Sequence, residues 1–139
     1  MSKHILLEIV TPNKIELRQE VDYLVAPTVN GMIGVLPGHI RLITQLATGV
    51  LRYKIDGVDK YMAVSEGFME VTPYKVIILA EAAELAEHID VEEALEEKRK
   101  AEEAIHRPTD VKLNIASAEV ELQRAVTKLE VAKKYGMYK

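Results

Sequence analysis

The sequence predicts an α+β protein in which an N-terminal antiparallel β-sandwich, residues 1–90, is followed by a C-terminal antiparallel two-helix hairpin, residues 91–139. Six of the seven glycines and four of the five prolines lie before residue 74. Apolar residues alternate with polar ones in the first part, whereas they recur at spacings of three and four in the second. Turn-forming residues separate short strands and interrupt helices, so their distribution favours this division.

The strands are predicted from a period of two. The alternation runs through Ile5, Leu7 and Ile9, then from Ile15 to Val25, and again through Leu51, Tyr53 and Ile55. Asp56-Gly57 is typical of a tight hairpin turn, here leading into a strand over residues 60–64. Strands over 67–71 and 75–80 follow, joined at Thr72-Pro73-Tyr74, and this spacing is typical of a sandwich or flattened barrel.

The helices are predicted from capping residues and apolar stripes. Asp90 can cap the first helix with Glu93 three residues later, and Pro108 ends it, after which Thr109 or Asp110 can cap the second. The apolar stripe of the first helix consists of Val91, Ala94, Ala101 and Ile105. That of the second has heptad spacing: Val111, Ile115, Ala118, Leu122, Ala125, Leu129 and Ala132. Alanines at the seam allow close approach but bury little area, which leaves open a fixed, tightly packed hairpin or one that can undock.

Composition excludes several classes of protein. Without cysteine there is no disulfide or thiolate site, and 5% aromatic residues with a net charge of −4 argue against nucleic-acid binding. The longest apolar run, residues 76–80, is too short to span a membrane, and Glu8 interrupts the apolar N-terminal stretch of a possible signal peptide. These features predict a soluble intracellular protein without direct membrane insertion.

Catalytic and metal-binding patterns are missing as well. There is no phosphate-binding loop and no nucleophile elbow, and Gly31-Met32-Ile33-Gly34 is not a dinucleotide fingerprint. Glu84, His88 and Asp90 could form a weak oxygen-rich metal site, but a solvated acidic junction explains them better, so no metal site is predicted. His39 could act as an acid or base, yet no nucleophile or convergent carboxylates accompany it, and an enzyme is the least supported alternative.

Several motifs in register resemble one family. Residues 34–39, Gly-Val-Leu-Pro-Gly-His, are similar to the G-I-L-P-G-H loop of the epsilon subunit of bacterial F-type ATP synthases. Residues 8–12 resemble the first strand and turn of that family, and residues 65–71 resemble its S-G-G-F-x-E-V strand, with Glu66 where glycine is usual. Residues 77–84 and Ile89-Asp90 match the last strand and linker, so the resemblance covers the whole chain.

The resemblance implies a non-catalytic rotor subunit of the central stalk, peripheral at the cytoplasmic face of the cell membrane. It would couple ion-driven ring rotation to ATP synthesis and restrain ATP hydrolysis. The sandwich would bind the gamma subunit and the ring of c subunits. Residues 29–39 are expected to form a loop, and the implied partner-binding residues within it are Met32, Ile33, Gly34, Pro37, Gly38 and His39. Met32 would lie at the ring contact, where many relatives carry an acidic residue.

For the hairpin, the resemblance implies a regulatory element that folds down on the sandwich or extends along gamma toward the alpha and beta subunits. Its basic residues would then meet acidic surface: Lys98, Arg99, Lys100, Arg124, Lys128, Lys133 and Lys134. Some relatives bind ATP in the folded hairpin, and the matching residues here are Glu84, Ile89, Asp90, Ala94, Arg124 and Lys128. Glu93 replaces the arginine of that motif, which reverses a charge beside the polyphosphate, so ATP binding is predicted to be weak or absent and no cofactor is required.

A different class of function also fits the residues. A stand-alone β-sandwich adaptor could use the heptad seam of its hairpin to recruit a partner helix. Co-purification separates the two hypotheses, because a rotor subunit requires stable association with a larger gamma-like subunit.

Overall fold

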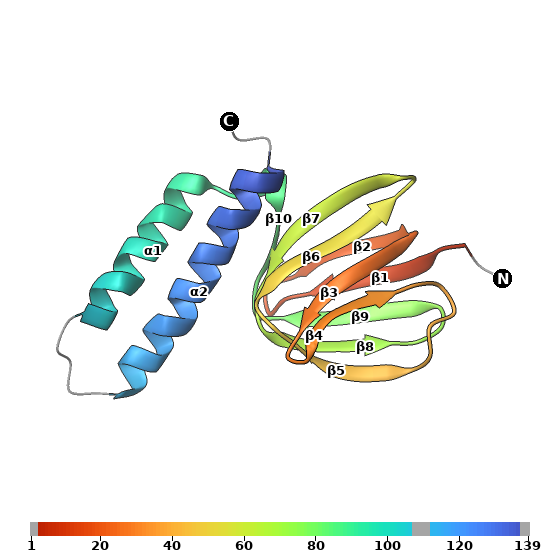
Figure 1. Ribbon diagram of the computed structural model, residues 1–139, viewed down its shortest axis with the longest axis horizontal. Coiled ribbons are helices and arrows are strands. Elements are labelled where there is room, and N and C mark those ends of the chain that lie inside the picture. Colours follow the sequence, from red (N-terminus) through yellow and green to blue (C-terminus); the bar gives the residue numbers. More distant parts are fainter. Residues whose placement is uncertain (1–2, 107–111, 137–139) are drawn as a thin grey trace. The chain divides into compact units, whose positions relative to one another are not determined.

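The computed structural model describes residues 3–106 and 112–136 of the chain. It divides into two compact units, Met1–Leu85 and Ala86–Lys139. The first unit contains the strands and the second the helices (Figure 1), so the predicted fold class is confirmed. In the described part of the chain, no helix combines the length and apolar character needed to cross a membrane.

In the described residues of the first unit, ten strands join in one sheet. Their order is β10-β7-β6-β3-β5-β8-β9-β1-β2, with β4 paired to β3. The strands are β1 (Ile5–Val10), β2 (Ile15–Val21), β3 (Tyr23–Thr28), β4 (Gly31–Val35), β5 (Leu42–Leu46), β6 (Gly49–Ile55), β7 (Val58–Val64), β8 (Gly67–Val71), β9 (Lys75–Ala80) and β10 (Ala83–Leu85). The pairs are antiparallel except β1 with β9, which is parallel.

The sheet is divided into two halves where β3 meets β5. These strands pair only at Thr28 and Leu46, whereas their other neighbours share several registered positions. One half is therefore β10-β7-β6-β3 with β4, and the other is β5-β8-β9-β1-β2. Alternate residues of both halves are buried, including Leu7 of β1, Leu51 of β6 and Ile78 of β9, and they form one hydrophobic core.

Two sequence predictions for this unit are wrong. The period of two was expected to continue through Val21, Tyr23 and Val25, but the chain bends at Asp22 between β2 and β3. The alternation of buried and exposed residues then shifts by one position, so that Leu24 is buried instead of its neighbours. Residues 29–39 were expected to form a loop, but Gly31–Val35 is strand β4, because glycine at Gly31 can adopt the positive φ of 111° that the tight β3–β4 turn requires. Strands β5 and β10 had not been predicted.

Local turn chemistry explains the predicted hairpin between β6 and β7. Asp56 and Gly57 have φ angles of 49° and 80°, the left-handed values of a two-residue type I′ turn. Aspartate tolerates this conformation better than most residues, and glycine adopts it freely. Gly67 is required for a different reason, since a Cβ there would collide with the carbonyl oxygen of Leu79 on β9.

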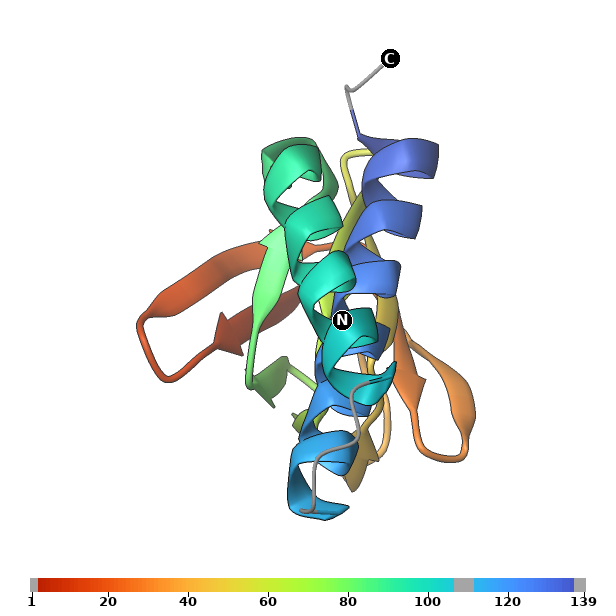
Figure 2. The same cartoon turned by 90° about the vertical axis from the view of Figure 1, so that its left-hand side faces the viewer.

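The second unit begins with a short 3-10 helix, η1 (Ala86–His88), followed by α1 (Val91–His106) and α2 (Lys112–Tyr135). Both views show α1 and α2 side by side as a hairpin (Figures 1 and 2). The predicted cap is confirmed, because the Glu93 amide donates to Asp90 Oδ1 at 3.1 Å. The alanines of both predicted stripes are buried: Ala94, Ala101, Ala118, Ala125 and Ala132.

Some predicted helix features lie outside the described residues. They are the stop at Pro108, the caps Thr109 and Asp110, and the seam position Val111, together with the side chain of Ile115. Leu122 and Leu129 are half-buried, which fits their place on the seam.

Candidate functional site

The β3–β4 ribbon carries the first group of predicted partner-binding residues. Met32 pairs with Pro27 across the ribbon and is 59% exposed, whereas Ile33 is half-buried and packs against the core. The tip is fixed by Thr28, whose hydroxyl donates to the carbonyl oxygen of Gly31 at 2.6 Å. The structure therefore separates the two apolar residues. Of the two, Met32 has the exposed side chain, and Ile33 packs against the core and anchors the ribbon.

The second group, Pro37-Gly38-His39, forms a tight turn after β4. The amide of His39 donates to the carbonyl oxygen of Leu36 at 3.1 Å, and Gly38 has a φ of 84°. Proline followed by a glycine with positive φ is the signature of a type II turn. The Gly38 amide donates to the carbonyl oxygen of Pro73 at 2.9 Å, which ties the turn to the β8–β9 connection. The backbone geometry of this turn therefore accounts for proline and glycine at positions 37 and 38.

The ring of His39 contacts the backbone of the next residue. Its Nδ1 lies 2.6 Å from the carbonyl oxygen of Ile40, so that nitrogen carries the proton when the bond forms. Ile40 and Leu36, on either side of the turn, are both exposed. The arrangement presents apolar side chains around a fixed turn, which suits contact with another protein surface.

A third surface was not predicted and lies on the outward side of β5-β8-β9-β1. Cross-strand register aligns Phe68 with Leu79, and Leu79 with Val10 on β1. Ile43 and Ile15 lie on the neighbouring strands β5 and β2, and both are exposed. We call this set the apolar face: Val10, Ile15, Ile43, Phe68, Ile77 and Leu79.

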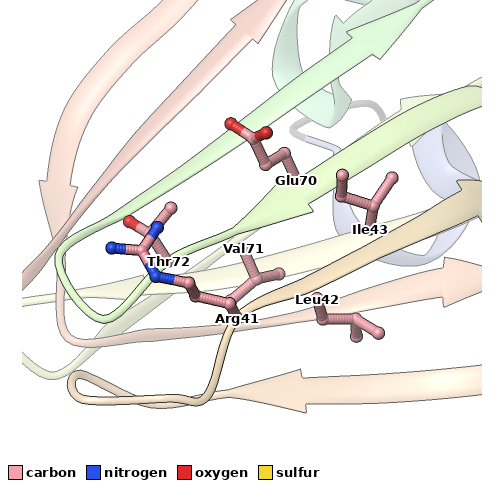
Figure 3. Close-up of a pocket in the computed structure, with 6 residues that line it drawn as sticks. All are labelled: Arg41, Leu42, Ile43, Glu70, Val71 and Thr72. Carbon is pink, nitrogen blue, oxygen red and sulfur yellow. The ribbon is translucent and has the colours of Figure 1, made fainter.

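Two open depressions border the apolar face. One, of about 440 Å³, is lined by Arg41, Leu42, Ile43, Glu70, Val71 and Thr72 (Figure 3). In it the Arg41 side chain extends toward Thr72, beside the aliphatic side chains (Figure 3). The other, of about 360 Å³, lies around Phe68 and Leu79. Shallow apolar hollows bordered by charged groups are typical of protein-binding surfaces rather than of small-molecule sites.

The outward side of the other half-sheet carries charged side chains on β6 and β7. Arg52 and Lys54 lie over the ring of Tyr23, with their charged ends 5.6 Å and 5.4 Å from its centroid. Arg52 also lies 3.8 Å from Asp59 across the β6–β7 pair. This part of the surface is therefore occupied by charged side chains that contact an aromatic ring or an opposite charge. The contrast between the two halves marks the apolar face as the side that has apolar area to bury against a partner.

The residues of the predicted nucleotide site are divided between the units. Glu84 lies in β10 of the first unit, and Ile89, Asp90, Ala94, Arg124 and Lys128 lie in the second. Within the second unit, Lys128 Nζ lies 3.3 Å and 3.4 Å from the two carboxylate oxygens of Glu97. The Lys128 side chain is only 17% exposed, so this ion pair joins α2 to α1 from a partly buried position.

The N-terminus of α1 is unfavourable for a polyphosphate. The Asp90 carboxylate already accepts a backbone hydrogen bond there, and Glu92 and Glu93 add negative charge in the first turn. Ala94 is buried, and its role is packing. Sequence reasoning missed the Glu97–Lys128 pair because the two residues are separated by 31 positions.

One further electrostatic feature lies along α1. Arg99 donates to Glu96 at 2.7 Å and to Glu103 at 2.8 Å. The hydrogen bond from Arg99 lowers the pKa of Glu96 below its ordinary value, and the hydrogen bond to Glu96 raises the pKa of Arg99. All three groups are exposed, so the ladder adds a modest local stabilisation of the helix.

Comparison with known families gives two matches in series. The family described as ATP synthase, Delta/Epsilon chain, beta-sandwich domain matches residues 4–86. The family described as ATP synthase, Delta/Epsilon chain, long alpha-helix domain matches residues 87–133. The chain is 44% identical over 131 residues to the ATP synthase epsilon chain of Nitratidesulfovibrio vulgaris (strain DP4), covering 94% of this chain and 97% of the relative. It is 47% identical over 109 residues to that of Carboxydothermus hydrogenoformans, covering 78% and 81% of the two chains.

Solved structures show the same fold. A chain in the cryo-EM structure of the Euglena gracilis mitochondrial ATP synthase, OSCP/F1/c-ring, has a TM-score of 0.78 and 26% identity, covering 96% of this chain and 83% of that one. A chain in the Tetrahymena thermophila mitochondrial ATP synthase, central stalk/c-ring, has a TM-score of 0.61 at 13% identity, over 94% and 97% of the two chains, and shows the fold alone.

Proposed function

Because the chain belongs to the ATP synthase delta/epsilon chain family, we propose that it couples ion-driven rotation to ATP synthesis and restrains ATP hydrolysis through its hairpin. It is a non-catalytic, epsilon-type subunit of the central stalk. Its place is the cytoplasmic face of the cell membrane, held there peripherally by the other subunits. Rotation must then pass through protein contacts, and these are expected on the sandwich.

The gamma subunit binds the apolar face in this proposal. The single observation that carries it is the cross-strand pair of exposed Phe68 and Leu79, with exposed Ile43 further along the neighbouring strand β5. Monomeric proteins rarely expose such contiguous apolar area without a partner. Glu8 provides a charged border, since it lies 3.5 Å from Arg18 and 3.8 Å from Lys75. An apolar centre with a charged border is the usual anatomy of a stable interface.

The ring of c subunits contacts the β3–β4 ribbon in this proposal. Met32 offers an exposed, flexible apolar side chain near the tip, and Val29 is exposed beside it. Methionine adapts to irregular surfaces, which suits a contact with a ring of repeated subunits. The motif turn of Pro37, Gly38 and His39 holds the following segment in a fixed conformation.

The hairpin is the regulatory element and meets the alpha and beta subunits when it extends. The alanine seam supports this proposal, because small residues bury little area per helix turn and two packings can then differ by a few kcal/mol. Extension that separates α1 from α2 breaks the Glu97–Lys128 pair and frees the lysine for an acidic partner surface. The pair is thus a stabiliser of the closed hairpin.

ATP is not a strong ligand of the hairpin in this proposal, and the chain needs no cofactor. Glu93 stands in the position of the motif arginine, and Lys128 is engaged by Glu97. A nucleotide would have to displace that carboxylate and approach two further glutamates at the start of α1. Charge repulsion in this turn outweighs the attraction of the helix dipole, which is about 0.3–1 kcal/mol at an exposed terminus.

Assembly tests the proposal. The chain is co-expressed with a gamma subunit, with Phe68→Asp as the test variant and Val58→Asp as the matched control. Both residues are exposed and apolar, at 59% and 56%, but Val58 begins β7 in the other half-sheet. We expect the wild-type chain and the Val58→Asp control to co-purify with gamma. The Phe68→Asp variant should not co-purify with it. Recruitment of an unrelated helix, with no retention on gamma, would instead favour the adaptor.

A further inference from the structure

The fold gathers three metal-ligating side chains at one corner of the sandwich. They are His4, just before β1, Asp22, between β2 and β3, and Asp56, in the β6–β7 turn. One ligand atom of each lies within 4.8 Å of the others, and His4 Nε2 is 3.3 Å from Asp22 Oδ1. The sequence predicted no metal site, because these residues are far apart along the chain and have no motif spacing.

Backbone contacts hold the corner in place. Ile5 pairs with Val21, so the residues on either side, His4 and Asp22, follow from the register of β1 and β2. The Asp22 amide donates to the carbonyl oxygen of Lys54 at 2.7 Å, and the Gly57 amide donates to Asp22 Oδ2 at 3.3 Å. The aspartate is thus fixed through one carboxylate oxygen, and the other is directed at His4.

We propose that His4, Asp22 and Asp56 bind one divalent transition-metal ion of the Zn²⁺ class. Two ligands of a tetrahedral Zn²⁺ are about 3.3 Å apart at the usual bond lengths of about 2.0–2.2 Å. The observed separation of His4 Nε2 and Asp22 Oδ1 already has this value. All three ligand atoms lie within 4.8 Å of one another, so Asp56 completes the set after a movement of at most about 1.5 Å, which its exposed side chain can make.

The donor set decides the class of metal. An imidazole nitrogen with two carboxylates suits Zn²⁺, Co²⁺ or Ni²⁺, whereas Mg²⁺ and Ca²⁺ prefer oxygen donors alone. Two carboxylates also balance the charge of a divalent ion at this corner. Three protein ligands leave one position for water or for a group from a neighbouring subunit. The ion would join the N-terminal segment to two turns, and none of its ligands belongs to the apolar face.

The test uses the metal-free full chain titrated with ZnCl₂ by isothermal calorimetry. We expect one Zn²⁺ per chain, with Kd raised at least about tenfold by His4→Gln and by Asp56→Asn. Asparagine tolerates the positive φ of 49° at position 56, so the turn should survive the second change. His106→Gln, at the exposed end of α1, is the matched control and should bind as wild type does.

Metal class and site are checked separately. An excess of MgCl₂ should leave Zn²⁺ binding unchanged, and the NMR signals of the His4 ring should shift on titration. Absence of binding by wild type, equal affinity for His4→Gln, or loss of binding in His106→Gln would each overturn the proposal. Displacement of Zn²⁺ by Mg²⁺ would overturn the assigned class of metal.

Discussion

Truncation of Phe68 measures the contribution of the apolar face to assembly. The residue is 59% exposed in the chain, so a partner can cover about three-fifths of its side chain. Full burial of a phenylalanine is worth about 1.5–3 kcal/mol, and the coverable share is about 1–2 kcal/mol. Phe68→Ala should therefore raise the Kd for gamma about 5- to 30-fold.

Surface plasmon resonance with immobilised gamma would measure this change, and chemical denaturation of the free variant would check its fold. Because the side chain is mostly exposed, the free energy of unfolding should fall by about 1 kcal/mol or less. Val58→Ala, on the other half-sheet, should leave the Kd unchanged. Equal affinities for wild type and Phe68→Ala would refute the assignment of gamma to this face.

Three further predictions concern the hairpin. Titration calorimetry should detect no micromolar ATP binding by wild type and tighter binding by Glu93→Arg, and micromolar affinity in wild type would contradict the repulsion argument. The double variant Ala118→Leu/Ala125→Leu should lower the free energy of unfolding by about 1–3 kcal/mol per site, since both alanines are buried. It should also change the rate of ATP hydrolysis by the complex. If neither the free energy of unfolding nor the rate changed, the close packing of the seam would be contradicted. Arg99 lowers the pKa of Glu96, so their stabilisation of α1 is present above the ordinary glutamate pKa and is lost as the pH falls through the lowered one. Circular dichroism should thus show a smaller acid-induced loss of helix in Arg99→Gln than in wild type, and equal losses would contradict it.

Local chemistry was predictable from the sequence. Asp56-Gly57 specifies its turn by backbone preference, and Asp90 caps α1 through a contact three residues away. The alanine stripes follow from helical periodicity, because Ala94 and Ala101 fall on one face of α1. These features depend on neighbours along the chain, and sequence patterns report such neighbours directly.

Features that depend on register could not be predicted in this way. Phe68 meets Leu79 only because β8 and β9 pair with one offset, and a shift of β8 by one residue would turn Phe68 inward while Leu79 stayed outward. The gathering of His4, Asp22 and Asp56 depends on the N-terminal segment and two separate turns. Strand β4 was missed for a local reason, since two glycines in five residues weaken a strand pattern that pairing with β3 overrides.

ATP hydrolysis by the assembled complex, with and without residues 91–139, tests the central claim most directly. The first unit ends at Leu85 and contains the hydrophobic core of the sandwich, so a chain ending at Asp90 should fold and join gamma. We predict that the complex with the shortened chain hydrolyses ATP faster than the intact complex, with the same amount of subunit bound. An unchanged or lower rate at equal occupancy would contradict a restraining hairpin, and failure of the shortened chain to bind gamma would contradict the assignment of assembly to the sandwich.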